Sequence, residues 1–216
     1  SHFFRDLSDD QAEGKIDFTL PILQDKNKGN KIKFGGSYFR KDRDFNEFIY
    51  SVYNQAGNNY NGDATAYFAD DNQGVISSES DRNTIGLYLV DNTRLENSYT
   101  GQTNIWATYG MATFQITEKL KFIGGARLES TDIAVESKDE NLDSLRRFGN
   151  IEALDLLPSI NLVYGLNETM NLRVAYTNTL ARPNMREIAP FASFGFIGDP
   201  PTSGNPQLLR TRVNNF

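Results

Sequence analysis

A two-residue alternation of apolar side chains on either side of a tight turn is the feature that most constrains the fold of this chain. Before the turn, Ile160, Leu162 and Tyr164 occupy every second position, and after it Leu172 and Val174 continue the pattern. Successive side chains of a β-strand point to opposite faces, so an apolar period of two residues indicates a strand with one apolar face. The segment therefore predicts a β-hairpin whose other face is polar.

The same alternation recurs along the chain and predicts an antiparallel meander in which each strand pairs with its neighbour in sequence. In the predicted strand 105–116 two phases of alternation compete. In the half next to the turn that follows, we favour the phase in which Ala112 and Phe114 share the apolar face. The phase of the upper half, around Trp106, stays open. The polar, acidic residues 1–14 are expected to precede the first strand. The predicted strands are residues 16–22, 31–40, 105–116, 120–130, 156–165 and 169–180, and the last residues begin a seventh.

The predicted connections alternate strictly between short turns and long polar loops. Outer-membrane barrels have this arrangement, with short turns in the periplasm and longer loops outside the cell. The expected fold class is therefore all-β: an antiparallel meander of about six to seven strands that forms part of a large transmembrane β-barrel. The short turns lie at 24–30, 117–119 and 166–168, and the extracellular loops at about 45–103, 131–154 and 183–206.

Composition agrees with such a sheet and argues against several other functions. Aromatic residues make up 12% of the chain and hydrophobic residues 38%, with a net charge of -6. This mild acidity argues against nucleic-acid binding, which requires clustered Lys and Arg. The chain has no cysteine, and its one histidine is His2, so a thiolate site, histidine acid-base catalysis and a histidine metal site are all disfavoured. We expect no enzyme, no metal and no cofactor.

Four segments carry a resemblance to a known family: FIGGARLE at 122–129, LPSINL at 157–162, NLRVAYTNTLARPNMREIAPF at 171–191 and GNPQLLRT at 204–211. Together they resemble the TonB-dependent receptors of the bacterial outer membrane, particularly those of the Bacteroidetes type. The resemblance covers about three quarters of the chain. It implies an internal piece of a barrel of about 22 strands, with the plug domain and the remaining strands outside residues 1–216.

The resemblance also implies a function and partners. Such a receptor binds a scarce nutrient at its extracellular loops and imports it with energy delivered through TonB. The nutrient would be a siderophore, a glycan, cobalamin or a peptide, and the sequence does not choose among them. The expected partners are outer-membrane lipid, the receptor's own plug and the TonB system, and a surface lipoprotein is left open.

Two groups of residues are candidates for the functional site. Aromatic and acidic side chains in the longest loop suit a ligand vestibule, although packing of the loop on itself would explain them equally well. Charged and amide side chains on the polar face of the strands point to a lumen, where they pair with one another or contact a plug. The loop candidates are Tyr53, Tyr60, Tyr67, Phe68, Asp70, Asp71 and Tyr88, and the lumen candidates are Lys33, Arg127, Glu129, Asn171 and Arg173.

A second function from another class stays open. A passive barrel, or a soluble all-β module, could present the same loops to a glycan or a protein partner. A strand face that contacts lipid would identify a membrane protein and exclude a soluble module. A plug with a TonB-binding segment upstream would identify active transport and exclude a passive barrel.

Overall fold

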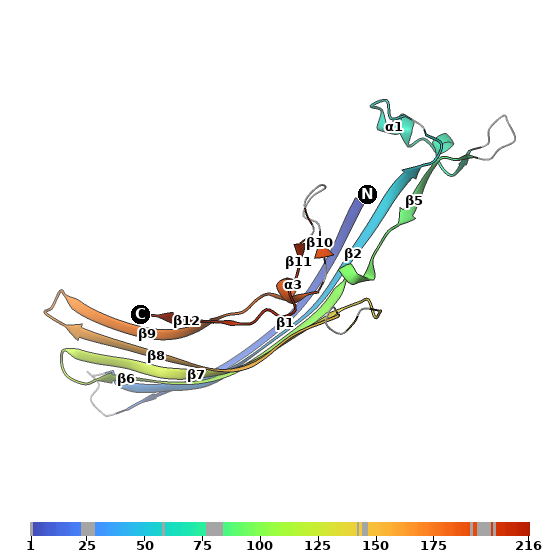
Figure 1. The fold of residues 1–216 in the computed structure, drawn as a ribbon. Coiled ribbons are helices and arrows are strands. Elements are labelled where there is room, and N and C mark those ends of the chain that lie inside the picture. Colours follow the sequence, from blue (N-terminus) through green and yellow to red (C-terminus); the bar gives the residue numbers. More distant parts are fainter. Residues whose placement is uncertain are drawn as a thin grey trace.

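One long antiparallel sheet forms the body of the protein (Figure 1). The computed structural model describes residues 2–22, 29–57, 59–76, 84–141, 143, 147–190, 192–193, 200 and 202–216. The strand order is β1-β2-β6-β7-β8-β9-β12, with the short β5 added to the far end of β2. The strands are β1 (His2–Pro21), β2 (Lys31–Asn54), β5 (Leu87–Asp91), β6 (Tyr99–Gln115), β7 (Leu120–Ser137), β8 (Phe148–Gly165), β9 (Asn171–Ala181) and β12 (Thr211–Asn215).

The predicted meander is confirmed, because the six expected strands are all present and each pairs with the next long strand in the chain. The phase left open in β6 is now fixed. Trp106 lies opposite Tyr38 of β2, and Phe114 lies opposite Phe122 of β7, so both share the apolar face with their partners. That face is the outward, lipid-side face of the sheet.

The strands are much longer than the alternation predicted, and this shortens the loops. Residues 2–14 belong to β1, and β2 continues to Asn54, so the first loop runs over 55–98 and not over 45–103. The second loop spans 138–147 in place of 131–154. Both errors have one cause: above the apolar band the outward positions, such as Asp42, Asp44 and Asp132, are polar, so an apolar outward period no longer marks a strand.

The third predicted loop, 183–206, does not simply extend away from the sheet. Its helix α3 (Met185–Ile188) lies against the concave, inward face (Figure 1). The helix begins with a capping box in which Asn184 and Glu187 each accept a hydrogen bond from the other's backbone N–H. The main apolar cluster lies beneath this helix and comprises Tyr99, Ile133, Val135, Ile151, Met185, Ile188 and Ala189.

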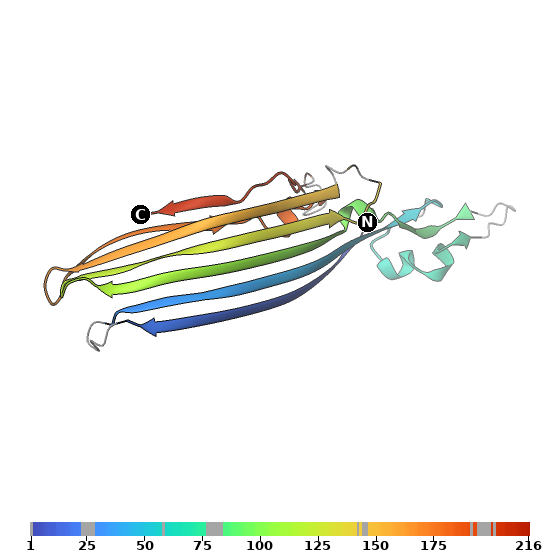
Figure 2. The same ribbon diagram turned by 90° about the horizontal axis from the view of Figure 1, so that it is seen from below.

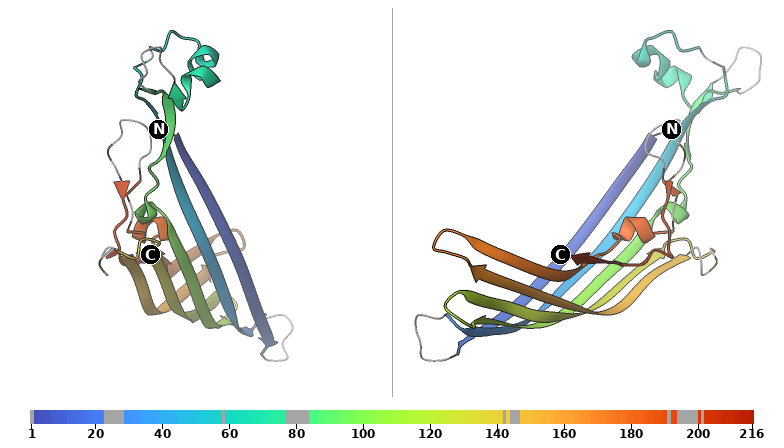
Figure 3. Two further views of the ribbon diagram at one scale, coloured as in Figure 1. Left: turned by 90° about the vertical axis from the view of Figure 1, so that its right-hand side faces the viewer. Right: turned by 60° about the vertical axis from the view of Figure 1, so that its left-hand side comes forward.

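The first loop builds a small structure beyond the end of the sheet (Figure 3). It contains α1 (Ala64–Tyr67), the 3-10 turn η1 (Asp70–Asn72) and the two-residue strands β3 (Val75–Ile76) and β4 (Thr84–Ile85). Asp63 caps α1, since its carboxylate accepts hydrogen bonds from two backbone N–H groups of the first turn. The 3-10 turn η2 (Leu95–Asn97) then leads into β6.

The outward face has a sharp polarity boundary. From the short turns upward it carries exposed apolar side chains such as Phe18, Phe34 and Ile160. The stacked rings of Tyr38 and Trp106, with centroids 4.1 Å apart, stand at its upper edge on β2 and β6. Aromatic residues concentrate at the interfaces of membrane barrels. We therefore take the residues below this pair as the apolar band and those above it as extracellular.

The sheet is curved but open. Among the described strands β1 pairs only with β2, and β12 pairs only with β9, so each outer edge keeps unpaired backbone groups (Figure 2). Two further pairs of short strands, β3 with β4 and β10 (Ala192–Ser193) with β11 (Thr202–Ser203), lie outside the main sheet. In the part of the chain that is described, no helix is long and apolar enough to cross a membrane.

Candidate functional site

The inward face of the sheet is polar below helix α3. Strict alternation along each strand places Lys33 and Arg127 on this face, and the registers place Asn171 opposite Gly165 and Arg173 opposite Val163, in the same inward phase. The five predicted lumen residues, including Glu129, thus share one face of the sheet. They do not form one cluster, because they are spread over β2, β7 and β9.

Lys33 belongs to a small group near the short-turn end of β1, β2 and β6. Its ammonium lies 3.6 Å from a carboxylate oxygen of Asp17 and 5.8 Å from the ring centroid of Tyr109. The Tyr109 hydroxyl donates a short hydrogen bond to Asp17, and Lys15 forms an ion pair with the same carboxylate at 3.3 Å. Its two lysines and one carboxylate give the lower end of the inward face a positive formal charge.

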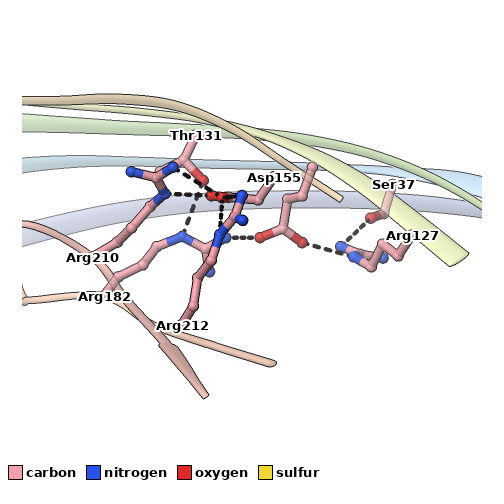
Figure 4. A network of polar contacts seen from close by, with 8 residues as sticks. Ser37, Arg127, Thr131, Asp155, Arg182, Arg210 and Arg212 are labelled. Atoms are coloured by element: carbon pink, nitrogen blue, oxygen red, sulfur yellow. Dashed lines mark hydrogen bonds and ion pairs between the residues drawn. The ribbon is translucent and has the colours of Figure 1, made fainter. Parts of the chain in front are cut away.

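A larger network lies higher on the inward face and centres on a buried carboxylate (Figure 4). Asp155 of β8 is 0% exposed and accepts hydrogen bonds from two arginines at the start of β12. Arg210 donates from Nη2 at 3.0 Å and Arg212 from Nε at 2.9 Å. A buried carboxylate requires such partners, because an unpaired charge away from water is strongly unfavourable.

Glu129 of β7 extends this network along β7 and toward β2. Its side chain is 8% exposed and forms ion pairs with Arg127 on its own strand, at 2.7 Å, and with Arg182 just after β9 (Figure 4). Arg182 also donates to the hydroxyl of Thr131 at 3.0 Å, and Arg127 reaches Ser37 on β2 at 3.3 Å. The ionic contacts therefore fix the segment after β9 onto strands that are distant in sequence.

Four arginines and two carboxylates meet in this network, so its formal charge is positive. Arg212 remains 54% exposed and Arg127 37% exposed, so both can also reach groups in the lumen. Guanidinium groups bind carboxylates and phosphates through paired, planar hydrogen bonds. The inward wall can thus hold an anionic group of a cargo molecule or of a neighbouring protein segment.

Sequence reasoning identified only part of this network. It singled out Arg127 and Glu129 but selected neither Arg182 nor Asp155. A signal for Asp155 was available: it is the one carboxylate inside an otherwise apolar and small-residue stretch of its strand, in the inward phase. No local pattern points to Arg210 and Arg212, since their partner is 55 and 57 residues away.

The predicted loop aromatics form two groups, one on the upper ends of β2 and β5 and one in the loop beyond the sheet. Tyr53 of β2 stacks on Tyr88 of β5 with ring centroids 5.8 Å apart. Tyr67 of α1 meets the edge of Tyr60 at 5.5 Å and of Phe68 at 5.1 Å. The two groups are joined indirectly, because Asn54, next to Tyr53 in β2, donates a hydrogen bond to the Tyr67 hydroxyl at 3.0 Å.

The predicted acidic residues of this loop lie in a short 3-10 turn. Asp70 and Asp71 are exposed in η1, the turn that follows Phe68. On the other side, hydrogen bonds from the side chain and backbone of Thr93 hold the pKa of Asp91 below its usual value. The loop therefore presents aromatic faces and carboxylates, a combination that suits polar organic ligands. Among the described residues, no group of three or more acidic or histidine side chains could hold a metal ion.

The fold and the two faces together define a class of protein. An antiparallel meander with an apolar outward band, an aromatic upper edge and a charged inward wall is the wall of a transmembrane β-barrel. The model of the outer membrane protein beta-barrel family matches residues 70–216, more than half of the chain, and the chain belongs to this family. Its location is the outer membrane, in contact with lipid. No curated protein matches the chain.

Proposed function

We propose that this chain is part of an outer-membrane receptor that binds a scarce nutrient outside the cell and imports it with energy delivered through TonB. The observation that carries the proposal is the charged inward wall, with its positive network around Asp155 and Glu129. A wall of this kind requires a polar occupant of the lumen, either water and cargo or a protein plug. The resemblance of 122–129, 157–162, 171–191 and 204–211 to TonB-dependent receptors supports the same conclusion.

The open sheet supports a large barrel. Unpaired backbone groups at a sheet edge in lipid cost several kcal/mol each, so β1 and β12 need further strands beside them. Seven strands in order span only a fraction of the circumference of a barrel that could contain a plug. We therefore assign the chain to an internal portion of the barrel, with plug and other strands supplied from outside residues 1–216.

The extracellular loop supplies the ligand contacts in this proposal. The ring pairs Tyr53–Tyr88 and Tyr60–Tyr67 offer flat apolar faces, and Asp70 and Asp71 offer acceptors. Sugars, peptides and organic chelates can all use such contacts. The proposal includes no catalytic step and no bound cofactor, and leaves the choice among siderophore, glycan, cobalamin and peptide to experiment.

Nutrient growth and uptake measurements test the proposal. A strain that lacks the gene is grown on a panel in which an iron chelate, cobalamin, an oligosaccharide or a peptide is the limiting nutrient. The nutrient on which the deletion strain fails to grow is then radiolabelled. Its uptake is measured in three strains: the parent, the receptor deletion and a TonB deletion. We expect uptake to fall to the same background in both deletions.

Each other outcome has a definite meaning. Uptake that needs the receptor but persists without TonB identifies a passive barrel. Wild-type growth of the deletion strain on every nutrient, together with loss of adhesion to a glycan or protein surface, identifies a binding module. Either result overturns active import.

A further inference from the structure

Two glycines stand diagonally to one another on the apolar outward face of neighbouring strands. Gly14 of β1 and Gly36 of β2 share the outward phase, and Gly36 lies two positions further from the extracellular end than Gly14. A Cβ atom at Gly14 would meet nothing within 4 Å. The missing side chains leave a hollow in the outward surface, which we name the glycine trench.

Aromatic side chains form both walls of the glycine trench. On the lower side Phe18 and Phe34 stack with centroids 5.4 Å apart, and on the upper side Tyr38 and Trp106 stack at 4.1 Å. The hollow has a volume of about 890 Å³, and its lining is mostly apolar. A flat lipid-facing surface would show single exposed side chains, whereas here two ring pairs enclose a recess.

A ladder of polar side chains begins directly above the upper wall. The Tyr38 hydroxyl donates to Asn104 at 3.1 Å, and Asn104 in turn donates to Gln102 at 3.2 Å. Gln102 and Arg40 both donate to Asp42, at 2.9 and 2.7 Å. Arg40 and Asp42 are 47% and 42% exposed, so the ladder offers donors and acceptors with nearly balanced charge.

We propose that the glycine trench and this ladder form a binding site for an outer-leaflet glycolipid, with one acyl chain in the trench and the sugar head on the ladder. The outward face is in contact with outer-membrane lipid, so acyl chains are available to fill the trench. An unfilled hollow would lose the dispersion contacts of its lining residues. Paired amides, a carboxylate and a guanidinium suit sugar hydroxyls. An exposed tyrosine–tryptophan pair at the boundary suits the linkage between head and chain.

The position on the barrel distinguishes this site from the rest of the apolar band. The trench opens at the edge of the band nearest the long loops, which is the extracellular side. The outer leaflet on that side consists of glycolipid, whereas phospholipid occupies the periplasmic leaflet. The site is separate from the inward wall and from the loop aromatics, and it does not depend on the transport function.

Native mass spectrometry of the full-length receptor tests the site directly. The receptor is extracted from outer membranes in mild detergent, and the fraction of molecules that keeps a lipopolysaccharide with truncated core is measured. Gly14→Leu places a side chain in the trench at a position where an added Cβ meets nothing within 4 Å, and it should lower that fraction about tenfold, as expected when roughly two methylene groups lose their contacts. Gln102→Ala should weaken retention of the glycolipid while leaving co-purified phospholipid unchanged.

Ala126→Leu is the matched control, because Ala126 has the same outward phase on β7 but does not line the trench. It should retain the glycolipid as the parent does. Boiling-sensitive migration on a gel verifies that each variant has folded. Equal retention by the parent and folded Gly14→Leu overturns the site, as does equal loss from Gly14→Leu and Ala126→Leu. A receptor dimer that the parent forms in the mass spectrum and that Gly14→Leu abolishes assigns the trench to a protein interface and also overturns the proposal.

Discussion

At the scale of the residue, the fold depends on a few carboxylates buried on the inward face. Asp155 is 0% exposed and forms ion pairs with Arg210, just before β12, and Arg212 of β12. Glu47 of β2, also 0% exposed, forms an ion pair with Arg5 of β1 at 2.7 Å. Buried ion pairs add little to stability over an apolar alternative, but removing one partner leaves a buried charge and is costly.

Replacing Asp155 by Asn should therefore loosen the segment that contains Arg210 and Arg212 without unfolding the sheet. We expect a loss of about 3 kcal/mol for local unfolding, because two guanidinium groups lose their common counter-charge. Hydrogen exchange or limited proteolysis of residues 202–215 in the full-length receptor measures this loss. Asp132→Asn is the matched control, since Asp132 is exposed on the outward face, and equal protection in both variants would contradict the assigned role.

The stacked rings of Tyr53 and Tyr88 give a second prediction at this scale. If they hold the imported nutrient, Tyr53→Ala and Tyr88→Ala should each raise the KM of uptake roughly 3- to 10-fold, the value of an aromatic contact. Maximal uptake should change little, because the barrel wall is untouched. Tyr164→Ala, on the outward face, should leave KM unchanged, and a KM unaffected by either loop variant would favour simple packing of the loop.

At the scale of the element, strands β7 and β8 each have two halves with opposite patterns. Below the level of Tyr38 and Trp106 the outward side chains are apolar, and above that level the inward side chains, such as Ile133 and Ile151, form the apolar cluster. Alternation alone could predict the lower halves, their pairing and their facing, because lipid imposes an apolar outward phase. It could not predict the upper halves, where the apolar phase depends on α3, which folds back from a distant part of the chain.

A charge placed on either face of one strand tests the facing. Ile160 of β8 is an outward residue that is 42% exposed, and Ser159 beside it faces inward. Ile160→Arg should lower folding stability in the membrane by about 2 to 4 kcal/mol, the cost of arginine at mid-depth in lipid. Ser159→Arg should assemble nearly as well as the parent, as judged by the boiling-sensitive band, and equal impairment of both would refute the assigned lipid face.

At the scale of the whole molecule, the open edges of the sheet govern assembly. β1 and β12 each pair on one side only among the described strands. A membrane sheet must close to satisfy its backbone groups. The length of the missing arc could not be predicted from alternation, because the pattern within a strand contains no information on the number of its neighbours.

Residues 1–216 expressed alone should therefore form no closed barrel in detergent or lipid. On an unboiled gel we expect this chain to migrate at its unfolded position, whereas the full-length receptor should migrate as a compact species that boiling removes. Fluorescent dye retained in vesicles gives a second readout, since an unclosed sheet should form no defined pore. A compact, boiling-sensitive species made by residues 1–216 alone would indicate a small self-contained barrel.

The length of β2 determines how far the extracellular loops stand above the membrane. Its 24 residues correspond to roughly 80 Å of extended chain, or roughly 60 Å of height at a tilt of about 40°. The apolar band of a barrel is only about 25 Å tall, so more than half of this strand stands clear of the hydrocarbon. The upper part of the barrel therefore holds the Tyr53 and Tyr67 loop well above the lipid head groups. Antibodies and bacteriophages can reach the loop at that height, whereas a dense sugar coat would keep them from the loops of a shorter barrel.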